Sequence, residues 1–315
     1  MTTIVTWLTH PAVSCWIFTE KQKRQIEGTI PGVRVIICRD KDAFLSSLSK
    51  ADIVFVWNFQ QSWLKLAPKL RRIITPAAGR EFLQLNPPAE ISVEYSSFHG
   101  KLIAETVLGM ILCQSRGILA TCKLQTVKQW PREELDKHMK LLRGSLVTIL
   151  GFGNLGTWIG RLAKPFGVRI CGIKRSITPP PDYFDKKDRI VAMDELESVL
   201  QDTDHLVLCL PGSTETNNIL NRSRLNLLPS HASIYNVGRG NAIDDKALVN
   251  ALHSGSIGAA YLDVFHEEPL PMDSPLRSCS NCFIMPHASV FAPEFMNCFV
   301  EEFLSRHESG YLKFR

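Results

Sequence analysis

Long hydrophobic runs are missing from this sequence of 315 residues, although 45% of its residues are hydrophobic. A helix that crosses a bilayer needs about 20 consecutive apolar residues, and no stretch of the chain provides them. The first residues, Met1 to Leu8, also lack the basic start and the long apolar segment of a secretory signal. We therefore expect a cytoplasmic protein with no membrane partner and a substantial core.

Clusters of one charge are also missing. The formal net charge is only +5, and no block of Lys and Arg is interleaved with aromatic residues. Such blocks are typical of nucleic-acid binding, so we expect no nucleic-acid partner. The small positive excess is either ordinary variation of a protein surface or the basic lining of a site for anionic ligands.

The nine cysteines form no pattern of disulfides or metal ligands. Their number is odd, and several lie in apolar runs, where a free thiol behaves as a small hydrophobic side chain: Cys38, Cys113, Cys171 and Cys209. Cys279 and Cys282 form one C-x-x-C motif, without a second pair or a histidine at the spacing of a zinc site. We expect no metal site, and we place this motif in a surface loop before a strand at 283–285.

Short β-type runs alternate with helical stretches along the chain. In the first hundred residues the expected strands are 3–7, 33–38, 53–57, 72–75 and 91–95. A long apolar helix is expected next, at 102–123. Six more strands are expected at 146–150, 168–173, 205–210, 233–237, 258–263 and 282–285. Such alternation indicates parallel sheets, so the expected fold class is α/β with two Rossmann-like domains.

The most informative motif follows the expected strand at 146–150. This apolar run leads into a G-x-G-x-x-G turn, and a helical pattern follows at once. The first glycine permits a tight turn, the second lets the backbone approach phosphate groups, and the third allows close packing of helix and strand. The N–H groups at the helix start attract an anion. The motif predicts a dinucleotide site formed by Gly151, Gly153, Asn154, Leu155 and Gly156.

The end of the next strand, at 168–173, bears on which dinucleotide is bound. An NAD-specific site usually has an acidic residue there, which accepts hydrogen bonds from the ribose 2′-OH. This chain has Lys174, Arg175 and Ser176 instead, and no carboxylate comes before Asp182. Cations and a hydroxyl attract a 2′-phosphate. We expect NADP as the preferred cofactor, with NAD as the alternative; otherwise the two basic residues are simply solvated.

Arg239, Glu268 and His287 each follow one of the last three expected strands. Ligands of open α/β sheets bind beyond the carboxyl ends of the strands, so these side chains can converge there. The arginine can hold a carboxylate and polarise a keto oxygen, the histidine can protonate that oxygen, and the glutamate can orient the imidazole. Taken singly, each residue can be an ordinary loop residue. Together they suit hydride reduction of a 2-oxo acid.

Several segments together resemble the D-isomer-specific 2-hydroxyacid dehydrogenases. The similarity covers nearly the whole chain and is strongest over 144–289, in the segments 150–156, 208–216, 236–240, 262–269 and 286–287. The resemblance implies that Arg239, Glu268 and His287 are catalytic and that Asp263 contacts the nicotinamide carboxamide. It also places three residues at strand ends beside the cofactor: Leu210, Pro211 and Val237.

The same resemblance extends to the first hundred residues. The segment 75–81 resembles the loop whose backbone N–H groups hold the substrate carboxylate, here Ala78, Gly79 and Arg80. The segment 97–105 resembles the hinge of the glyoxylate and hydroxypyruvate reductase-like branch, and the helix at 102–123 resembles the family's dimerisation region. Two departures concern the substrate: Arg80 replaces a smaller or apolar residue, and the segment after His287 lacks the usual glycine and threonine.

We expect a substrate-binding domain made of 1–97 and 287–315 and a cofactor domain of 98–286, with the active site in the cleft between them. The expected function is NAD(P)-dependent reduction of a small 2-oxo acid to the D-2-hydroxy acid, by a homodimer. A nucleotide-sensing binding protein or corepressor on the same fold is the alternative, because fold does not determine function. A formate dehydrogenase-like enzyme is disfavoured, because that branch is expected to carry an amide in place of Glu268.

Overall fold

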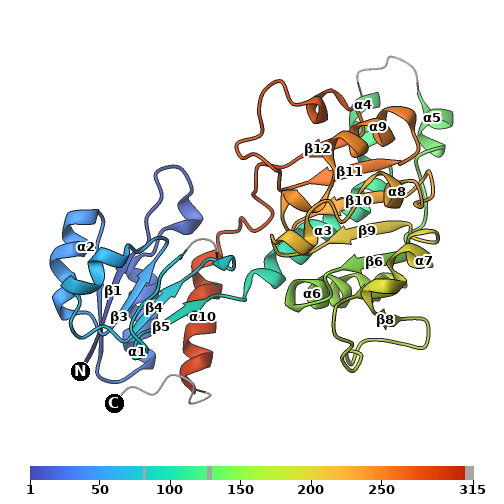
Figure 1. The fold of residues 1–315 in the computed structure, drawn as a ribbon. Helices are drawn as coiled ribbons and strands as arrows, with labels where there is room; N and C mark the ends of the chain where they lie inside the picture. Colours follow the sequence, from blue (N-terminus) through green and yellow to red (C-terminus); the bar gives the residue numbers. More distant parts are fainter. Residues whose placement is uncertain (81–82, 126–129, 309–315) are drawn as a thin grey trace. The chain divides into compact units, whose positions relative to one another are not determined.

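A computed structural model describes residues 1–80, 83–125 and 130–308 of the chain (Figure 1). The chain forms two compact units. The first combines Met1–His99 with Phe291–Arg315, and the second consists of Gly100–Val290. Among the described residues, no helix combines the length and the apolar character needed to cross a membrane.

The first unit is built on a five-stranded sheet with the order β2-β1-β3-β4-β5, in which every neighbouring pair is parallel. The strands are β1 (Thr2–Trp7), β2 (Val33–Ile37), β3 (Ile53–Val56), β4 (Arg72–Thr75) and β5 (Ser92–Tyr95). The helices include α1 (Glu20–Thr29), α2 (Lys41–Ser47) and α10 (Phe295–Glu308). The C-terminal helix thus joins a sheet made by the first hundred residues.

Strand β3 is apolar throughout because both of its faces are buried. On one face, the Phe55 ring packs against Phe299 and Phe303 of α10, with centroid distances of 5.1 and 5.0 Å. On the other face, Val54 belongs to a core cluster that includes Phe44 of α2. A continuous apolar run, without alternation, is typical of a central strand in a covered parallel sheet.

The second unit is built on a seven-stranded parallel sheet with the order β12-β11-β10-β9-β6-β7-β8. Its strands are β6 (Leu146–Leu150), β7 (Arg169–Ile173), β8 (Arg189–Val191), β9 (His205–Leu208), β10 (Ser233–Asn236), β11 (Ala259–Leu262) and β12 (Cys282–Ile284). The chain runs from β6 outward to β8, then returns to the other side of β6 and continues from β9 to β12. The order therefore reverses between β6 and β9, and such a reversal is where open α/β sheets bind ligands.

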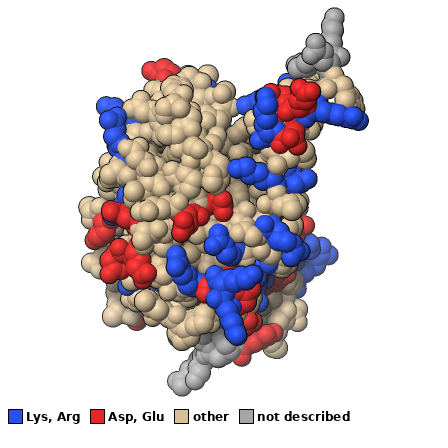
Figure 2. All heavy atoms as spheres, turned by 90° about the vertical axis from the view of Figure 1, so that its right-hand side faces the viewer, with Lys and Arg blue, Asp and Glu red and all other residues tan. Residues whose placement is uncertain are grey.

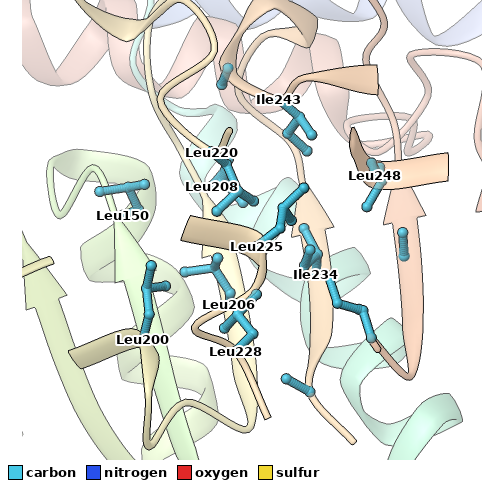
Figure 3. Close-up of a cluster of buried hydrophobic side chains, with 14 of the residues drawn as sticks. Leu150, Leu200, Leu206, Leu208, Leu220, Leu225, Leu228, Ile234, Ile243 and Leu248 are labelled. Atoms are coloured by element: carbon cyan, nitrogen blue, oxygen red, sulfur yellow. The ribbon is translucent and has the colours of Figure 1, made fainter. Parts of the chain in front are cut away.

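Helices cover both faces of this sheet. On one face lie α3 (His99–Ser115) and α6 (Asn154–Ala163), which contribute Val107, Ile111 and Ile159 to the core. On the other face lie α7 (Leu196–Leu200), α8 (Arg222–Leu225) and α9 (Asp245–Ser254). Figure 3 shows this second core, in which leucine and isoleucine side chains of β6, β9 and β10 meet leucines of these three helices.

The expectation of one helix over 102–123 is wrong. Helix α3 ends at Ser115, and a separate helix, α4 (Ile118–Leu124), begins after Gly117. Gly117 has a φ of +59°, a left-handed conformation that glycine adopts at little cost. The break also pairs with a later segment, because the Lys140 N–H donates to the Ser115 carbonyl over 2.7 Å. A short helix, α5 (Arg132–Asp136), precedes that segment.

Two further details differ from the sequence-based expectation. Strand β8 was not expected; it has only three residues and pairs with β7 alone, so it carries no recognisable pattern. The C-x-x-C motif lies in a turn before β12, as expected, and Cys282 begins that strand, but Cys279 is not at the surface, because it is only 3% exposed. The cysteines of the described chain are free thiols.

Candidate active site

The glycine turn between β6 and α6 leaves open space in front of the helix. Gly151 has a φ of +97°, and a Cβ there would lie 2.8 Å from the Cys209 carbonyl oxygen. A Cβ on Gly156 would lie 2.9 Å from the Gly151 oxygen, whereas a Cβ on Gly153 would meet nothing within 4 Å. Gly153 is also the N-cap of α6 and has no side chain with which to cap it. Backbone N–H groups at the start of α6, at Asn154 and Leu155, therefore face a space suited to an anion.

The end of β7 presents basic and hydroxyl side chains. Lys174 is half-buried, and its ammonium donates to the Thr178 hydroxyl over 3.1 Å. Arg175 and Ser176 are exposed. The next carboxylate along the chain, Asp182, forms an ion pair of 2.8 Å with Arg161 on α6. The strand end thus offers cationic donors, and the nearest carboxylate in sequence is engaged by another arginine.

Arg239 is held between two glycines that press against neighbouring loops. A Cβ on Gly238 would lie 2.6 Å from the Leu210 carbonyl oxygen, after β9. A Cβ on Gly240 would collide with the backbone of Phe265, after β11. Only glycine permits these approaches, so the loop that carries Arg239 is fixed against the loops on both sides.

Asn236, at the end of β10, stabilises the same loop from beneath. This side chain is 1% exposed. Its amide donates to the Arg239 carbonyl over 3.0 Å, and its oxygen accepts from the Gly238 N–H over 3.2 Å. The Arg239 guanidinium donates to the Gly238 carbonyl over 2.7 Å. Asn236 was not expected as a separate functional residue, because a buried amide that closes a turn leaves no signal in composition or spacing.

Glu268 and His287 form a hydrogen-bonded pair at the ends of β11 and β12. The distance between His287 Nδ1 and Glu268 Oε2 is 2.8 Å. The other carboxylate oxygen accepts from the Phe265 N–H over 2.9 Å, which orients the carboxylate. Because Nδ1 donates to Glu268, Nε2 is the imidazole nitrogen left to carry a transferable proton. The backbone of Phe265 also packs against Gly240, next to Arg239. The three predicted catalytic segments therefore contact one another beyond the carboxyl ends of the strands.

Asp263 anchors the segment that carries His287. Its side chain is 1% exposed, and one oxygen accepts from the N–H groups of Ala288 and Ser289 over 2.6 and 3.1 Å. The other oxygen accepts from the Ser289 N–H and hydroxyl. A carboxylate has about four acceptor sites, and these bonds use them. Asp263 therefore holds the segment 288–289 in place. This role was not expected; the expected role was a contact with the nicotinamide carboxamide.

The remaining predicted residues lie in both units. In the second unit, Leu210 is half-buried and its side chain would lie 3.2 Å from a Cβ on Gly151, whereas Pro211 is exposed and Val237, directly after β10, is buried. In the first unit, Ala78 and Arg80 are exposed after β4, and Gly79 between them is half-buried. Thr106 on α3 was not expected near the site; its hydroxyl donates to the Ser289 carbonyl over 2.7 Å.

Comparisons with known proteins identify the family of the chain. A family model for the D-isomer specific 2-hydroxyacid dehydrogenase, NAD binding domain, matches residues 108–289, which is more than half of the chain. The chain is 30% identical over 259 residues to a glyoxylate reductase of Aeropyrum pernix, and the alignment covers 79% of this chain and 76% of the relative.

Solved structures resemble the chain over almost its full length. A D-isomer specific 2-hydroxyacid dehydrogenase family protein of Aeromonas salmonicida is 27% identical, with a TM-score of 0.78 and coverage of 98% of this chain and 96% of that one. A D-isomer specific 2-hydroxyacid dehydrogenase of Xanthobacter autotrophicus, solved with NADPH and MES, is 25% identical, with a TM-score of 0.76 and coverage of 98% and 95%. The chain therefore belongs to the D-isomer specific 2-hydroxyacid dehydrogenases, a family of oxidoreductases.

Proposed function

We propose that the protein reduces a small 2-oxo acid to the D-2-hydroxy acid with NADPH or NADH. The observation that carries this proposal is the Glu268–His287 pair. It lies beyond the carboxyl ends of the strands, on the same side of the sheet as Arg239. An imidazole held by a carboxylate is a proton donor, and a guanidinium is a partner for a carboxylate. A 2-oxo acid needs both at once.

The residues at the glycine turn fit a dinucleotide. Gly153 borders open space, and the start of α6 offers backbone N–H groups to a pyrophosphate. Lys174, Arg175 and Ser176 would receive the adenosine ribose or its 2′-phosphate. The bound nicotinamide would supply hydride to the substrate carbon, or accept it in the reverse reaction.

The protein's own residues would perform the remaining steps. Arg239 would bind the substrate carboxylate and polarise the keto oxygen. His287 would donate the Nε2 proton to that oxygen, while Glu268 holds the ring and compensates the positive charge of the imidazolium. In the oxidation direction, His287 would accept the proton from the hydroxyl group.

The substrate class is a small 2-oxo acid of the glyoxylate or hydroxypyruvate kind. The name of the Aeropyrum pernix relative, glyoxylate reductase, supports this class. We include Ala78, Gly79 and Arg80 among the substrate-binding residues. Arg80 would add a partner for a second anionic group, so a dianionic oxo acid is part of the proposal.

The test is the oxidation of NADPH, followed by absorbance, with glyoxylate, hydroxypyruvate, pyruvate, a bulkier 2-oxo acid and a dianionic 2-oxo acid. We expect turnover with at least one of the small acids and production of the D-isomer, identified by chiral chromatography. Cofactor binding without turnover on any acid would favour the nucleotide-sensing alternative over an enzyme.

A further inference from the structure

His287 has a backbone conformation that residues other than glycine rarely adopt. Its φ is +51°, which lies in the left-handed region. In this region the Cβ of an ordinary residue is crowded by its own backbone, so the conformation is unfavourable by itself. Such a conformation persists only where the surrounding structure holds it. The position of the candidate proton donor therefore depends on the contacts of the residues next to it.

Hydrogen bonds to Asp263 hold the backbone of the segment 287–289. The His287 N–H donates to the Asp263 main-chain carbonyl over 2.9 Å. The next two N–H groups, those of Ala288 and Ser289, donate to the Asp263 carboxylate over 2.6 and 3.1 Å. Three consecutive N–H groups are thus bound by one buried residue. The backbone fixed in this way brings the His287 imidazole to Glu268.

Ser289 adds a side-chain contact to the same carboxylate. Its hydroxyl donates to Asp263 Oδ2, and its N–H donates to both oxygens. Ser289 is only 4% exposed, so water has little access to these bonds. An alanine at this position would keep the N–H contacts and lose the hydroxyl contact. The hydroxyl therefore holds the carboxylate in the orientation that binds the two N–H groups.

Thr106 attaches the end of this segment to a helix. Its hydroxyl donates to the Ser289 carbonyl over 2.7 Å. Thr106 lies on α3, which is anchored in the core of the second unit by its neighbour Val107 and by Ile111. Helix α3 therefore gives the segment 287–289 a fixed support that a surface loop could not provide.

We propose that Thr106 and Ser289 are positioning residues for His287. The hydrogen bonds from Thr106 to Ser289, and from Ser289 to Asp263, keep the left-handed backbone of His287 in place. They thereby keep His287 Nδ1 within 2.8 Å of Glu268 and fix the direction of Nε2. Both residues would act through the imidazole. The inference rests on the proposed function, in which His287 is the proton donor.

Kinetics with a 2-oxo acid and NADPH provide the first test. Thr106→Val keeps the shape of the side chain and removes its hydroxyl, and Ser289→Ala removes the other hydroxyl. We expect each substitution to lower kcat by about tenfold, because a displaced imidazole donates its proton more slowly. KM for the acid and Kd for NADPH should change little. The solvent isotope effect on kcat, measured in D₂O, should increase, and Thr106→Ser should restore kcat.

Two control variants separate this role from a purely structural one. Thr29→Val removes a threonine hydroxyl that donates to a carbonyl within helix α1. Ser233→Ala removes a buried serine hydroxyl at the start of β10, at the opposite end of that strand from Arg239. Both can alter the free energy of unfolding, but kcat and its solvent isotope effect should stay as in the unmodified protein.

A ¹⁵N NMR spectrum of the His287 imidazole tests its position without turnover. The signal is assigned by its loss in His287→Gln. In the unmodified protein the neutral ring should carry its proton on Nδ1, which faces Glu268. In Thr106→Val and Ser289→Ala the proton should be shared with Nε2. Absence of turnover with every acid would contradict the proposed function alone. An imidazole spectrum unchanged in both variants would show that the positioning proposal is wrong, whether or not an acid is reduced.

Discussion

Gly240 has the least room of the residues around the candidate active site. A Cβ at this position would overlap the backbone of Phe265 and His266. Gly240→Ala must therefore push apart the loops that carry Arg239 and Glu268. We expect a loss of more than about 3 kcal/mol in the free energy of unfolding, because overpacking against backbone has no easy relief. We also expect kcat/KM of the folded variant to fall, because both displaced loops carry candidate catalytic residues.

The measurements for Gly240→Ala are urea unfolding and kcat/KM at 25 °C. Gly28→Ala is the matched control, because a Cβ on Gly28 of α1 would meet nothing within 4 Å. It should change the free energy of unfolding by less than about 1 kcal/mol. Equal effects of the two substitutions would contradict the tight approach at Gly240.

Replacement of His287 and replacement of Arg239 should change different kinetic constants. His287→Ala removes the proton donor, so we expect kcat to fall by about 100-fold or more while NADPH still binds. Arg239→Ala should mainly raise KM, because it removes the partner of the substrate carboxylate. Steady-state kinetics and a fluorescence titration with NADPH separate these effects. Near wild-type turnover in His287→Ala would disprove its assignment.

His205 should make the fold sensitive to acid. Its pKa is lowered by burial to about 4 in the folded protein and is 6.5 when unperturbed. Between pH 6.5 and about 4, His205 is therefore protonated in the unfolded chain and neutral in the folded chain. The contribution is complete above pH 6.5 and is lost as pH falls toward 4, and it amounts to about 3 kcal/mol.

Urea unfolding at pH 7, 5.5 and 4 tests this prediction. His205→Gln should flatten the fall in unfolding free energy between pH 6.5 and 4, whatever its effect at pH 7. An unchanged slope in His205→Gln would show that this histidine does not titrate as described.

The candidate catalytic residues could be predicted because each one follows a strand, and strands are visible in the sequence as apolar runs. The residues that hold them in place could not be predicted in the same way. Asn236 acts within a turn, and Asp263 accepts hydrogen bonds from residues 25 and 26 positions later. The Asp263 contacts depend on how the segments after β11 and β12 lie beside each other, which no local pattern contains, whereas the Asn236 contacts lie within one turn. Sequence spacing thus identifies candidate catalytic residues more readily than the residues that hold them in place.

At the scale of elements, the hydrophobic pattern predicts the bounds of strands that are buried apolar runs. It does not predict bounds that are determined by turns. Strands β4 and β6 have the expected ends, and both are buried runs. The break between α3 and α4 was not expected, because the expected helix at 102–123 includes Gly117. Its left-handed backbone is imposed by pairing of the segment around Arg116 with Met139, an interaction between distant parts of the chain.

The end of β7 carries the prediction of cofactor preference. We expect a higher kcat/KM with NADPH than with NADH, because Arg175 and Lys174 would meet a 2′-phosphate. Arg175→Ala should reduce this preference by about 10- to 100-fold, the worth of a charged contact of about 1.5–3 kcal/mol. Lys174 already donates to Thr178, so its replacement should matter less.

Initial rates with both cofactors test the preference. Lys186→Ala, at an exposed lysine elsewhere in the second unit, should leave the ratio unchanged. A clear preference of the unmodified protein for NADH would contradict the role proposed for this strand end.

At the scale of the whole molecule, we propose a homodimer formed through the second unit. Three apolar side chains are exposed around the break that follows α3: Ile118 (45%), Met139 (40%) and Leu141 (74%). Figure 2 shows one face of the molecule, on which uncharged surface separates groups of charged residues. Exposed apolar residues gathered in one place are typical of an interface.

Light scattering at micromolar concentration should give the mass of two chains. Leu141→Glu should favour the monomer, because it places a charge in the proposed interface. Met272→Glu changes an equally apolar and 85% exposed residue elsewhere, and should leave the dimer intact. A monomeric mass for the unmodified protein would rule out the interface.

The Thr106–Ser289 hydrogen bond has a consequence for how the gene can be edited. It joins the two ends of the second unit, six residues after Gly100 and one before Val290. In the first unit, the rings of His99 and Phe295 lie 5.8 Å apart, so the flanking ends are also neighbours. Closely spaced ends are what domain insertion requires. The second unit is thus an insert in the first, and a short peptide could close the gap that its excision leaves.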